Sequence, residues 1–372
     1  MKITIVLGAF FPVPTVMGGA VEKIWSALAR EFATRGHAVT LISRAIPQFQ
    51  KNEIVDGVRY LRVPGFDTPR SLLWLKFLDL IYSWRVRRVL PPADILVTNT
   101  FWLPLLARDR SQGKIYVHVG RYPKGQMWLY HRAARLQAPS RDIADAMGRR
   151  AARWKNKIVA IPYPRPSVSD ASVVPIDQRE KIVLFVGRVH PEKGVHLLIE
   201  AFAALHDSVL AGWKLVLVGP TETNAGGGGA DYLHGLRQSA SSMNGRVEFR
   251  GPIFDEQKLA QEFRAARIFA YPSLAARGET FGLAPLEAMT HGCAVIVSDL
   301  GCFRDFVTPD ETGFVFPHDA ADPAGELAKT LQRAVSTLEK LARVAAAGRL
   351  KSKDFSIERV ADKFLADFAS LK

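Results

Sequence analysis

Residues 270–299 contain the pattern that most restricts the fold of this chain. A short apolar run closes at Tyr271 and Pro272, and a glycine-containing loop follows it. Residues 285–290 have helical composition, Gly292 ends that helix, and residues 294–298 form a second apolar run. The segment therefore predicts a strand, a loop, a helix and a second strand in this order.

The start of the chain repeats this arrangement. Residues 1–7 are a short apolar run halted by two prolines, which predicts a first buried strand rather than a signal peptide. Residues 20–35 have apolar side chains at helical spacing, and residues 38–43 predict a second strand. Because βαβ units favour a parallel sheet, we expect an α/β fold. Further strands are expected at residues 94–98, 115–119, 157–162, 182–186, 214–218 and 247–249, and further helices at 195–205, 323–348 and from Ser356 onward.

The length and composition indicate two globular domains. The chain has 372 residues, of which 48% are hydrophobic and 23% charged, as is typical of soluble proteins with two domains of ordinary size. A polar, proline-bearing stretch from Tyr163 to about Lys181 predicts the linker between them. Cys293 and Cys302 are too few for a disulfide framework and lack metal-ligand spacing, which fits a reducing, cytoplasmic setting. No run reaches the ~18 apolar residues of a transmembrane helix.

The positive charge is confined to the first part of the chain. Residues 1–165 contain 27 Lys and Arg against 10 Asp and Glu, whereas residues 166–372 contain 23 against 26. This asymmetry predicts an anionic partner, either a membrane surface, an acidic acceptor or nucleic acid, although a solvated basic surface is the alternative.

Residues 71–84 predict an amphipathic helix within this basic part. Its polar residues, Lys76, Asp79 and Ser83, are expected on one narrow stripe, and three arginines follow directly. The broad apolar face suits either a bilayer interface or burial against the sheet.

Two carboxylates frame the loop and helix of residues 270–299. Glu279 lies in the loop and Glu287 on the expected first turn of the helix. Backbone N–H groups at a helix N-terminus are unpaired and carry the positive end of the helix dipole, so they favour an anion. A diphosphate fits there, with hydroxyls for the two glutamates. The alternative is an ordinary α/β unit whose carboxylates are solvated.

Cations mark a second helix start, before residues 195–205. Arg188 and Lys193 lie on either side of the turn that leads into this helix. We expect the two side chains and the backbone N–H groups to converge on one anion.

His118 is the candidate site residue of the first domain. It follows an expected strand, and ligands of parallel sheets bind outside the carboxyl ends of the strands, so it is expected to face a cleft. A lone histidine is more often structural, which is the alternative. Arg121, Tyr122 and Lys124 come next and would form an anion-binding wall for an acceptor.

Two sequence motifs of the chain are similar to those of a known family. They are G-E-x-F-G-L-x-x-L-E-A-M-x-x-G at residues 278–292 and G-R-x-x-x-x-K-G at residues 187–194. The chain resembles, over nearly its whole length, the family 4 retaining glycosyltransferases, which have the GT-B fold of two Rossmann-like domains facing a cleft. The resemblance implies an acceptor-binding domain at residues 1–165, a donor-binding domain at 166–355, and a helix at 356–372 that crosses back to the first domain.

The resemblance also implies roles for individual residues. Arg188 and Lys193 would bind the donor diphosphate, Glu279 the donor sugar and Glu287 the ribose, with His118 on the opposite side of the sugar. The donor site would be completed by Gly18 and Gly19 near the phosphates, by Arg250, Gly251 and Ile253 at the base-binding turn, and by Thr280, Phe281, Gly282 and Leu283 in the loop. Residues 163–166, Tyr-Pro-Arg-Pro, replace the Asn-Gly-x-Asp that is common in the family at the hinge.

We therefore expect a retaining glycosyltransferase that uses a nucleoside-diphosphate sugar, a UDP-sugar before a GDP-sugar. The expected acceptor is membrane-associated or part of an envelope polysaccharide, such as a lipid-linked glycan or lipopolysaccharide, and the enzyme is expected to lie peripherally on the cytoplasmic face of the membrane. Retention follows from the resemblance alone. No D-x-D motif occurs, so neither a metal nor another cofactor is expected.

Two other functions stay open. A sugar-nucleotide epimerase or hydrolase of the same fold would share the donor site. A basic, non-enzymatic binding module would explain the charge, but the sequence has no recognisable nucleic-acid-binding motif, and no nucleic-acid partner is expected.

Overall fold

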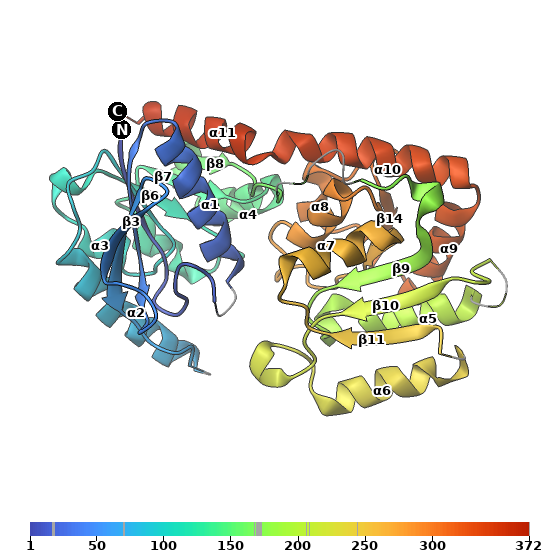
Figure 1. The fold of residues 1–372 in the computed structure, drawn as a ribbon. Coiled ribbons are helices and arrows are strands. Elements are labelled where there is room, and N and C mark those ends of the chain that lie inside the picture. The colour runs from blue at the N-terminus through green and yellow to red at the C-terminus, as the bar shows by residue number, and fades with distance from the viewer. Residues whose placement is uncertain are drawn as a thin grey trace. The chain divides into compact units, whose positions relative to one another are not determined.

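The computed structural model describes residues 1–16, 19–69, 71–166, 168, 173–205, 207, 209–243 and 245–371. The chain forms two compact units (Figure 1). Unit 1 comprises Met1–Pro164 together with Ile357–Lys372, and unit 2 comprises Arg165–Ser356. Among the helices of the described ranges, none combines the length and hydropathy needed to cross a membrane.

Unit 1 is built on an eight-stranded sheet in the order β3-β4-β2-β1-β5-β6-β7-β8. All neighbours are parallel except β3 and β4 at one edge, which are antiparallel. The strand order changes direction between β1 and β5, because the chain extends the sheet first on one side of β1 and then on the other. The strands are β1 (Lys2–Val6), β2 (Ala38–Ala45), β3 (Asn52–Val55), β4 (Val58–Pro64), β5 (Ile95–Thr98), β6 (Lys114–His118), β7 (Arg135–Ala138) and β8 (Ile158–Ala160).

One face of this sheet is covered by α1 (Ala20–Thr34) and the C-terminal helix α11 (Ile357–Ala369), which lie against each other (Figure 1). Phe364 and Phe368 of α11 contact Trp25 and Phe32 of α1 and Tyr116 of β6. The aromatic face of the last helix, which was expected from its spacing, is therefore a packing face within unit 1.

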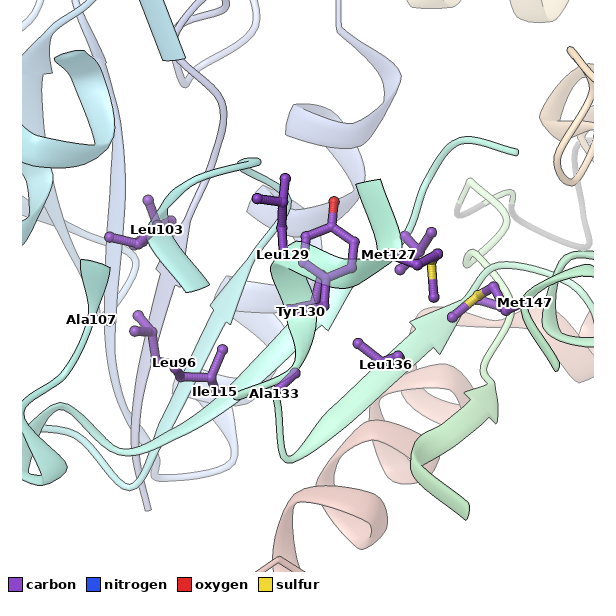
Figure 2. Packing of buried hydrophobic residues seen from close by; sticks show 14 of the residues in the cluster. Leu96, Leu103, Ala107, Ile115, Met127, Leu129, Tyr130, Ala133, Leu136 and Met147 are labelled. Carbon is purple, nitrogen blue, oxygen red and sulfur yellow. The ribbon is translucent and has the colours of Figure 1, made fainter. Parts of the chain in front are cut away.

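The opposite face carries a cluster of buried apolar side chains (Figure 2). Side chains alternate along a strand, so Ile115 points away from Tyr116 and into this cluster. Tyr82, Met127 and Met147 come from three different covering elements. These elements and their neighbours are α2 (Leu72–Arg87), α3 (Leu103–Leu106), α4 (Arg141–Arg150) and the 3₁₀ helices η1 (Arg110–Gln112), η2 (Gly125–Tyr130) and η3 (Ala152–Lys157).

Unit 2 is built on a six-stranded parallel sheet in the order β11-β10-β9-β12-β13-β14. Its first strand, β9, lies between β10 and β12, so the strand order changes direction between β9 and β12. The strands are β9 (Glu180–Val186), β10 (Lys214–Val218), β11 (Val247–Gly251), β12 (Ala266–Tyr271), β13 (Ala294–Ser298) and β14 (Phe314–Phe316). The helices are α5 (Val195–Leu205), α6 (Ala230–Ala240), α7 (Glu256–Ala265), α8 (Leu283–Thr290), α9 (Pro323–Val335) and α10 (Leu338–Ser352), with 3₁₀ helices that include η6 (Pro191–Lys193).

The α/β fold class with two parallel-sheet domains is confirmed. The predicted helix at residues 195–205 and strand at 214–218 have the observed bounds. The single helix expected at residues 323–348 is wrong, because the chain breaks at Ser336 and Thr337 between α9 and α10. The Thr337 side chain accepts a hydrogen bond from the Lys340 N–H at 3.1 Å and caps the new helix.

The narrow polar stripe expected on α2 is divided in the structure. Asp79 and Ser83 are buried and Lys76 is exposed, and Leu73 and Trp74 on the apolar stretch are 80% and 54% exposed. The reason is a tertiary contact: the Asp79 carboxylate accepts hydrogen bonds from the backbone N–H groups of Phe101 and Trp102 at 3.0 and 3.3 Å. A buried carboxylate with such donors is satisfied, so the polar side of the helix can face the core.

Candidate active site

Two predicted motifs of unit 2 lie side by side in the structure. The segment 187–194 follows β9 and the loop before α8 follows β12, and the strand order changes direction between these two strands. The chain leaves β9 through Gly187 and reaches Lys193 in η6, and it leaves β12 through Pro272 and reaches Glu279. Loops that follow the two strands on either side of such a point diverge and leave a crevice, where ligands of parallel sheets bind. The Glu192 carbonyl accepts a hydrogen bond from the Leu274 N–H at 2.8 Å, which joins the two loops directly.

Gly194 allows this close approach. Its φ is +67°, and a Cβ at this position would lie 2.0 Å from the Pro272 carbonyl oxygen. Only glycine tolerates both this positive φ and the close approach of the Pro272 carbonyl, which explains why the motif at residues 187–194 ends in glycine.

Lys193 and Glu279 form an ion pair between these two loops. The Lys193 Nζ donates a hydrogen bond to Glu279 Oε2 at 2.6 Å, and the Ser273 hydroxyl donates to the same oxygen at 3.2 Å. The ammonium group also lies 5.4 Å from the centre of the Tyr271 ring. The Lys193 and Glu279 side chains are only 9% and 12% exposed, so each charge depends on the other for compensation.

Arg188 has other partners in this structure. Its guanidinium donates to the Gly226 carbonyl at 2.8 Å and to Glu192 at 2.5 Å. In this structure the two cations therefore bind different carboxylates, Arg188 that of Glu192 and Lys193 that of Glu279. The sequence predicted the turn between β9 and α5 that carries both cations, but it did not predict that Glu192 and Glu279 are their partners.

The helix after the loop begins earlier than expected. α8 spans Leu283–Thr290, with Gly282 at its N-cap, so Glu287 lies on the second turn and not on the first. Glu287 is half-buried. The Phe281 side chain, expected at the donor site, is 1% exposed and packs against the rings of Phe306 and Phe355, so only its backbone is left for a ligand. Thr280 and Leu283 are half-buried.

The expected base-binding turn lies at the edge of the unit 2 sheet. Arg250, the fourth residue of β11, pairs with Glu248 and with Glu262 at 2.7 and 2.5 Å. The Gly251 carbonyl accepts a hydrogen bond from the Gly219 N–H at 2.8 Å, and Ile253 is half-buried. The Arg250 side chain is therefore engaged within unit 2.

His118 ends strand β6 in unit 1, as expected, and its ring is buried among other side chains of that unit. The ring is 3% exposed and packs edge-on against Trp25. Its Nδ1 lies 2.5 Å from Gln137 Oε1, and its Nε2 lies 3.0 Å from the Tyr163 hydroxyl. Burial lowers the pKa of His118 to about 4, so the ring is neutral at pH 7.

These contacts assign the tautomer of His118. The Gln137 amide nitrogen donates to the carbonyls of Ala138 and Ile161 at 2.9 and 2.6 Å, so the amide oxygen faces the imidazole. Nδ1 is then the protonated nitrogen, and Nε2 accepts a hydrogen bond from Tyr163. Gln137 and Tyr163 were not identified from the sequence, although Tyr163 stands where the family pattern is broken.

The other site residues predicted in unit 1 have different surroundings. Arg121 and Lys124 are exposed, and Tyr122 packs partly against the apolar cluster. Gly19 is the N-cap of α1 with a φ of +108°, and a Cβ there would lie 2.5 Å from a carboxylate oxygen of Glu22. Gly18 lies outside the described residues.

Three side chains of unit 2 form the one group among the described residues with the spacing of metal ligands. They are Asp299, which follows β13, and His318 and Asp319, which follow β14, with ligand atoms within 4.8 Å of one another. His318 Nδ1 is hydrogen-bonded to Asp299 Oδ1, so two of the possible ligand atoms are already engaged with each other.

Comparisons with known proteins agree with this arrangement. Residues 19–164 match the family described as glycosyl transferase 4-like domain, and residues 169–351 match glycosyl transferases group 1. Over 339 residues, 87% of this chain and 84% of the other, the sequence is 28% identical to the phosphatidyl-myo-inositol mannosyltransferase of Mycobacterium tuberculosis.

Solved structures share the fold over the full length. The sucrose-phosphate synthase of Thermosynechococcus elongatus has a TM-score of 0.77 and 22% identity, with 100% of this chain and 99% of that chain covered. The HepE protein of Anabaena, solved in complex with UDP and glucose, has a TM-score of 0.71 and 19% identity, with both chains covered completely.

Proposed function

Since this chain belongs to the group 1 glycosyltransferases and has the GT-B fold, we propose that it transfers a sugar with retention from a nucleoside-diphosphate sugar to a membrane-associated or envelope-polysaccharide acceptor. The observation that carries the proposal is the Lys193–Glu279–Ser273 cluster at the point where the unit 2 sheet changes direction. A cation and a carboxylate side by side match the two parts of such a donor, a diphosphate and a sugar rich in hydroxyls.

The proposed mechanism assigns a separate task to each partner of the ion pair. The difficult step is cleavage of the bond between the anomeric carbon and the diphosphate oxygen, since negative charge grows on that oxygen. Lys193 and the N-terminus of α8 compensate this charge from fixed positions. Glu279 accepts hydrogen bonds from the sugar hydroxyls, and the acceptor hydroxyl attacks from the face that the diphosphate leaves, giving its proton to the departing phosphate. Side chains supply the positive charge, so the reaction needs no metal.

We propose a UDP-sugar as the donor. The support is the Anabaena structure, which was solved with UDP and glucose and shares the fold of the whole chain. The site geometry does not select a base, because the Arg250 side chain is held by two glutamates. Titration of UDP, GDP and ADP by calorimetry gives the base directly, and binding of GDP but not UDP would contradict this part of the proposal.

We propose a membrane surface as the place of action. The exposed side of α2 presents Leu72, Leu73, Trp74 and Phe77, and the stacked Trp74 and Phe77 rings are 5.1 Å apart. Arg88 stacks on Trp84 at 3.4 Å near the other end of the helix. Apolar side chains next to cations are suited to the interface of an anionic bilayer.

The central test replaces Lys193. Lys193→Ala removes one preorganised charge, worth on the order of 2.7–4 kcal/mol of transition-state stabilisation, so turnover should fall by ~100-fold or more. Lys214→Ala is the matched control, because Lys214 also pairs with a glutamate of unit 2 but begins strand β10 and lies outside the cluster. Equal turnover in the two variants would contradict the proposed site.

The same assay separates a transferase from a hydrolase or epimerase. With an acceptor, a transferase releases UDP and forms a glycoside in equal amounts. Release of UDP and free sugar at the same rate without acceptor would identify a hydrolase, and a changed sugar nucleotide would identify an epimerase.

A further inference from the structure

Unit 1 contains a pocket that none of the donor-site residues line. Its volume is about 600 Å³, within the range of pockets that bind small molecules. The walls come from η2 on one side and from the end of α4 with the start of η3 on the other. The pocket therefore lies between segments that cover the same face of the unit 1 sheet as α2.

Three cations line this pocket. Lys124 precedes η2, Arg150 ends α4, and Arg153 is the second residue of η3. All three residues are exposed, and within the described part of the chain their side chains have no carboxylate partner and no hydrogen bond. Arg150 is stabilised by the negative end of the α4 dipole, whereas Lys124, on the opposite wall, has no such partner among the described residues. Three uncompensated cations around one concavity favour an anion.

Two tryptophans complete the walls. Trp128 of η2 is 57% exposed, while its neighbours Met127 and Leu129 are buried in the apolar cluster of Figure 2 and hold η2 in place. Trp154 is 8% exposed, and the Arg153 guanidinium lies 4.4 Å from its ring centre. A large aromatic surface beside cations offers packing for a carbon skeleton as well as charge for its anionic group.

We propose that this pocket binds a phosphate group attached to a small organic headgroup. Two arginines recognise a phosphate through paired N–H groups, and Trp128 packs on the carbon skeleton that carries it. A simple inorganic anion would use the cations but not the tryptophan. The proposal does not depend on the donor site, since every lining residue belongs to unit 1 and the Lys193 cluster to unit 2.

The phosphate could come from a soluble ester or from a lipid. The lipid is favoured by the position of the pocket, because α2 with its exposed Leu73 and Trp74 covers the same face of the sheet. Glycerol 3-phosphate is the soluble probe, with glycerol and inorganic phosphate as comparisons. Vesicles of phosphatidylglycerol, compared with phosphatidylcholine, are the lipid probe.

The test uses two double variants of the full chain with equal charge. Arg150→Gln with Arg153→Gln removes two pocket cations. Arg149→Gln with Lys155→Gln removes two exposed cations from the same segments that do not line the pocket. Loss of charge-assisted hydrogen bonds should weaken glycerol 3-phosphate binding, measured by calorimetry, by at least about 10-fold in the pocket variant. The control variant should bind as the wild type does.

Further readouts give each result a clear meaning. Trp128→Ala should weaken glycerol 3-phosphate binding but not inorganic phosphate binding, and UDP binding should be unchanged in all variants. Vesicle binding lost in the pocket variant alone would assign the phosphate to a lipid, and soluble binding lost without a vesicle effect would assign it to a soluble ester. Equal affinities in both double variants, or no binding of any phosphate probe to the wild type, would overturn the proposal.

Discussion

At the residue scale, the proposed donor site contains an ion pair that is already formed. Lys193 and Glu279 neutralise each other at 2.6 Å, with both side chains largely buried. A diphosphate has to compete with Glu279 for the ammonium group, and the donor sugar has to compete with Lys193 for the carboxylate. This competition makes the two residues separable by substitution.

Glu279→Gln should show the competition directly. The amide keeps the shape of the side chain but removes its charge, so Lys193 becomes more available to phosphate. We expect UDP to bind more tightly by roughly fivefold, equivalent to about 1 kcal/mol, while turnover falls because the sugar loses its carboxylate partner. Calorimetry with UDP and a turnover assay measure the two effects. Weaker UDP binding in this variant would show that Lys193 and Glu279 do not compete in this way.

His118 should remain neutral well below pH 6. Burial lowers its pKa to about 4, whereas an unfolded chain binds this proton near pH 6.5. Between these values the unfolded state binds more protons, so the stabilising contribution is complete above about pH 6.5 and is lost as the pH falls towards 4. Histidine ¹⁵N resonances should show the Nδ1–H tautomer and no titration above pH 5.

The stability measurement needs a comparison, because Asp79 acts in the opposite direction. Burial raises the pKa of Asp79 to about 7, so the folded state gains protons there as the pH falls. His118→Gln should have a smaller loss of unfolding free energy between pH 6.5 and 4.5 than the wild type. An equal loss in urea unfolding would contradict the buried, neutral state of His118.

At the scale of elements, α2 is a helix that buries two polar residues, Asp79 and Ser83, on its inward side. Asp79 accepts two N–H groups of the segment after β5, and Tyr82 and Val86 join the apolar cluster. The helix therefore packs on the sheet through one side and exposes apolar side chains on the other. The two interpretations of its sequence, a core helix and an interfacial helix, are compatible because they concern different sides.

Leu73→Glu combined with Trp74→Glu should abolish binding to anionic vesicles. These two side chains supply apolar contact, and each nearby cation adds about 1 kcal/mol on an anionic surface. Ile54→Glu with Val55→Glu is the matched control, since both residues are exposed on edge strand β3 of the same unit. Co-sedimentation across a salt series measures binding, whose electrostatic part weakens as the Debye length falls below about 8 Å. Equal retention of both variants would argue against contact through α2.

At the scale of the whole molecule, the first and second parts of the chain differ in charge. Residues 1–165 have an excess of 17 positive charges, and residues 166–372 an excess of three negative ones. A membrane or an acidic acceptor is therefore expected to bind unit 1, while the compensated cations of unit 2 are proposed to bind one small donor.

Activity should persist after metal removal. In the proposed mechanism, Lys193 and the start of α8 provide the positive charge that a divalent ion would otherwise supply. Turnover in EDTA is expected to equal turnover in added Mg²⁺ or Mn²⁺, with Asp299→Asn testing whether the group of Asp299, His318 and Asp319 contributes. A strict requirement for either ion would contradict the proposed mechanism.

The sequence by itself determined the fold class and the order of its parts. Apolar periodicity reports local geometry, so the βαβ alternation and the helix at residues 195–205 were predictable, and glycines such as Gly194 mark turns that only they can adopt. The resemblance assigned the motifs around Lys193 and Glu279 to one donor site, and the structure brings these two side chains into contact.

Only the tertiary structure decided which polar groups face each other. Glu279 lies 86 positions from Lys193, Gln137 lies 19 from His118, and Asp79 finds its donors 22 and 23 residues away. A polar side chain can be buried when a remote segment supplies its hydrogen-bond partner, and no periodicity of its own helix or strand contains that information. For this reason the inward turn of Asp79, the tautomer of His118 and the pairing of Lys193 with Glu279 emerged from packing alone.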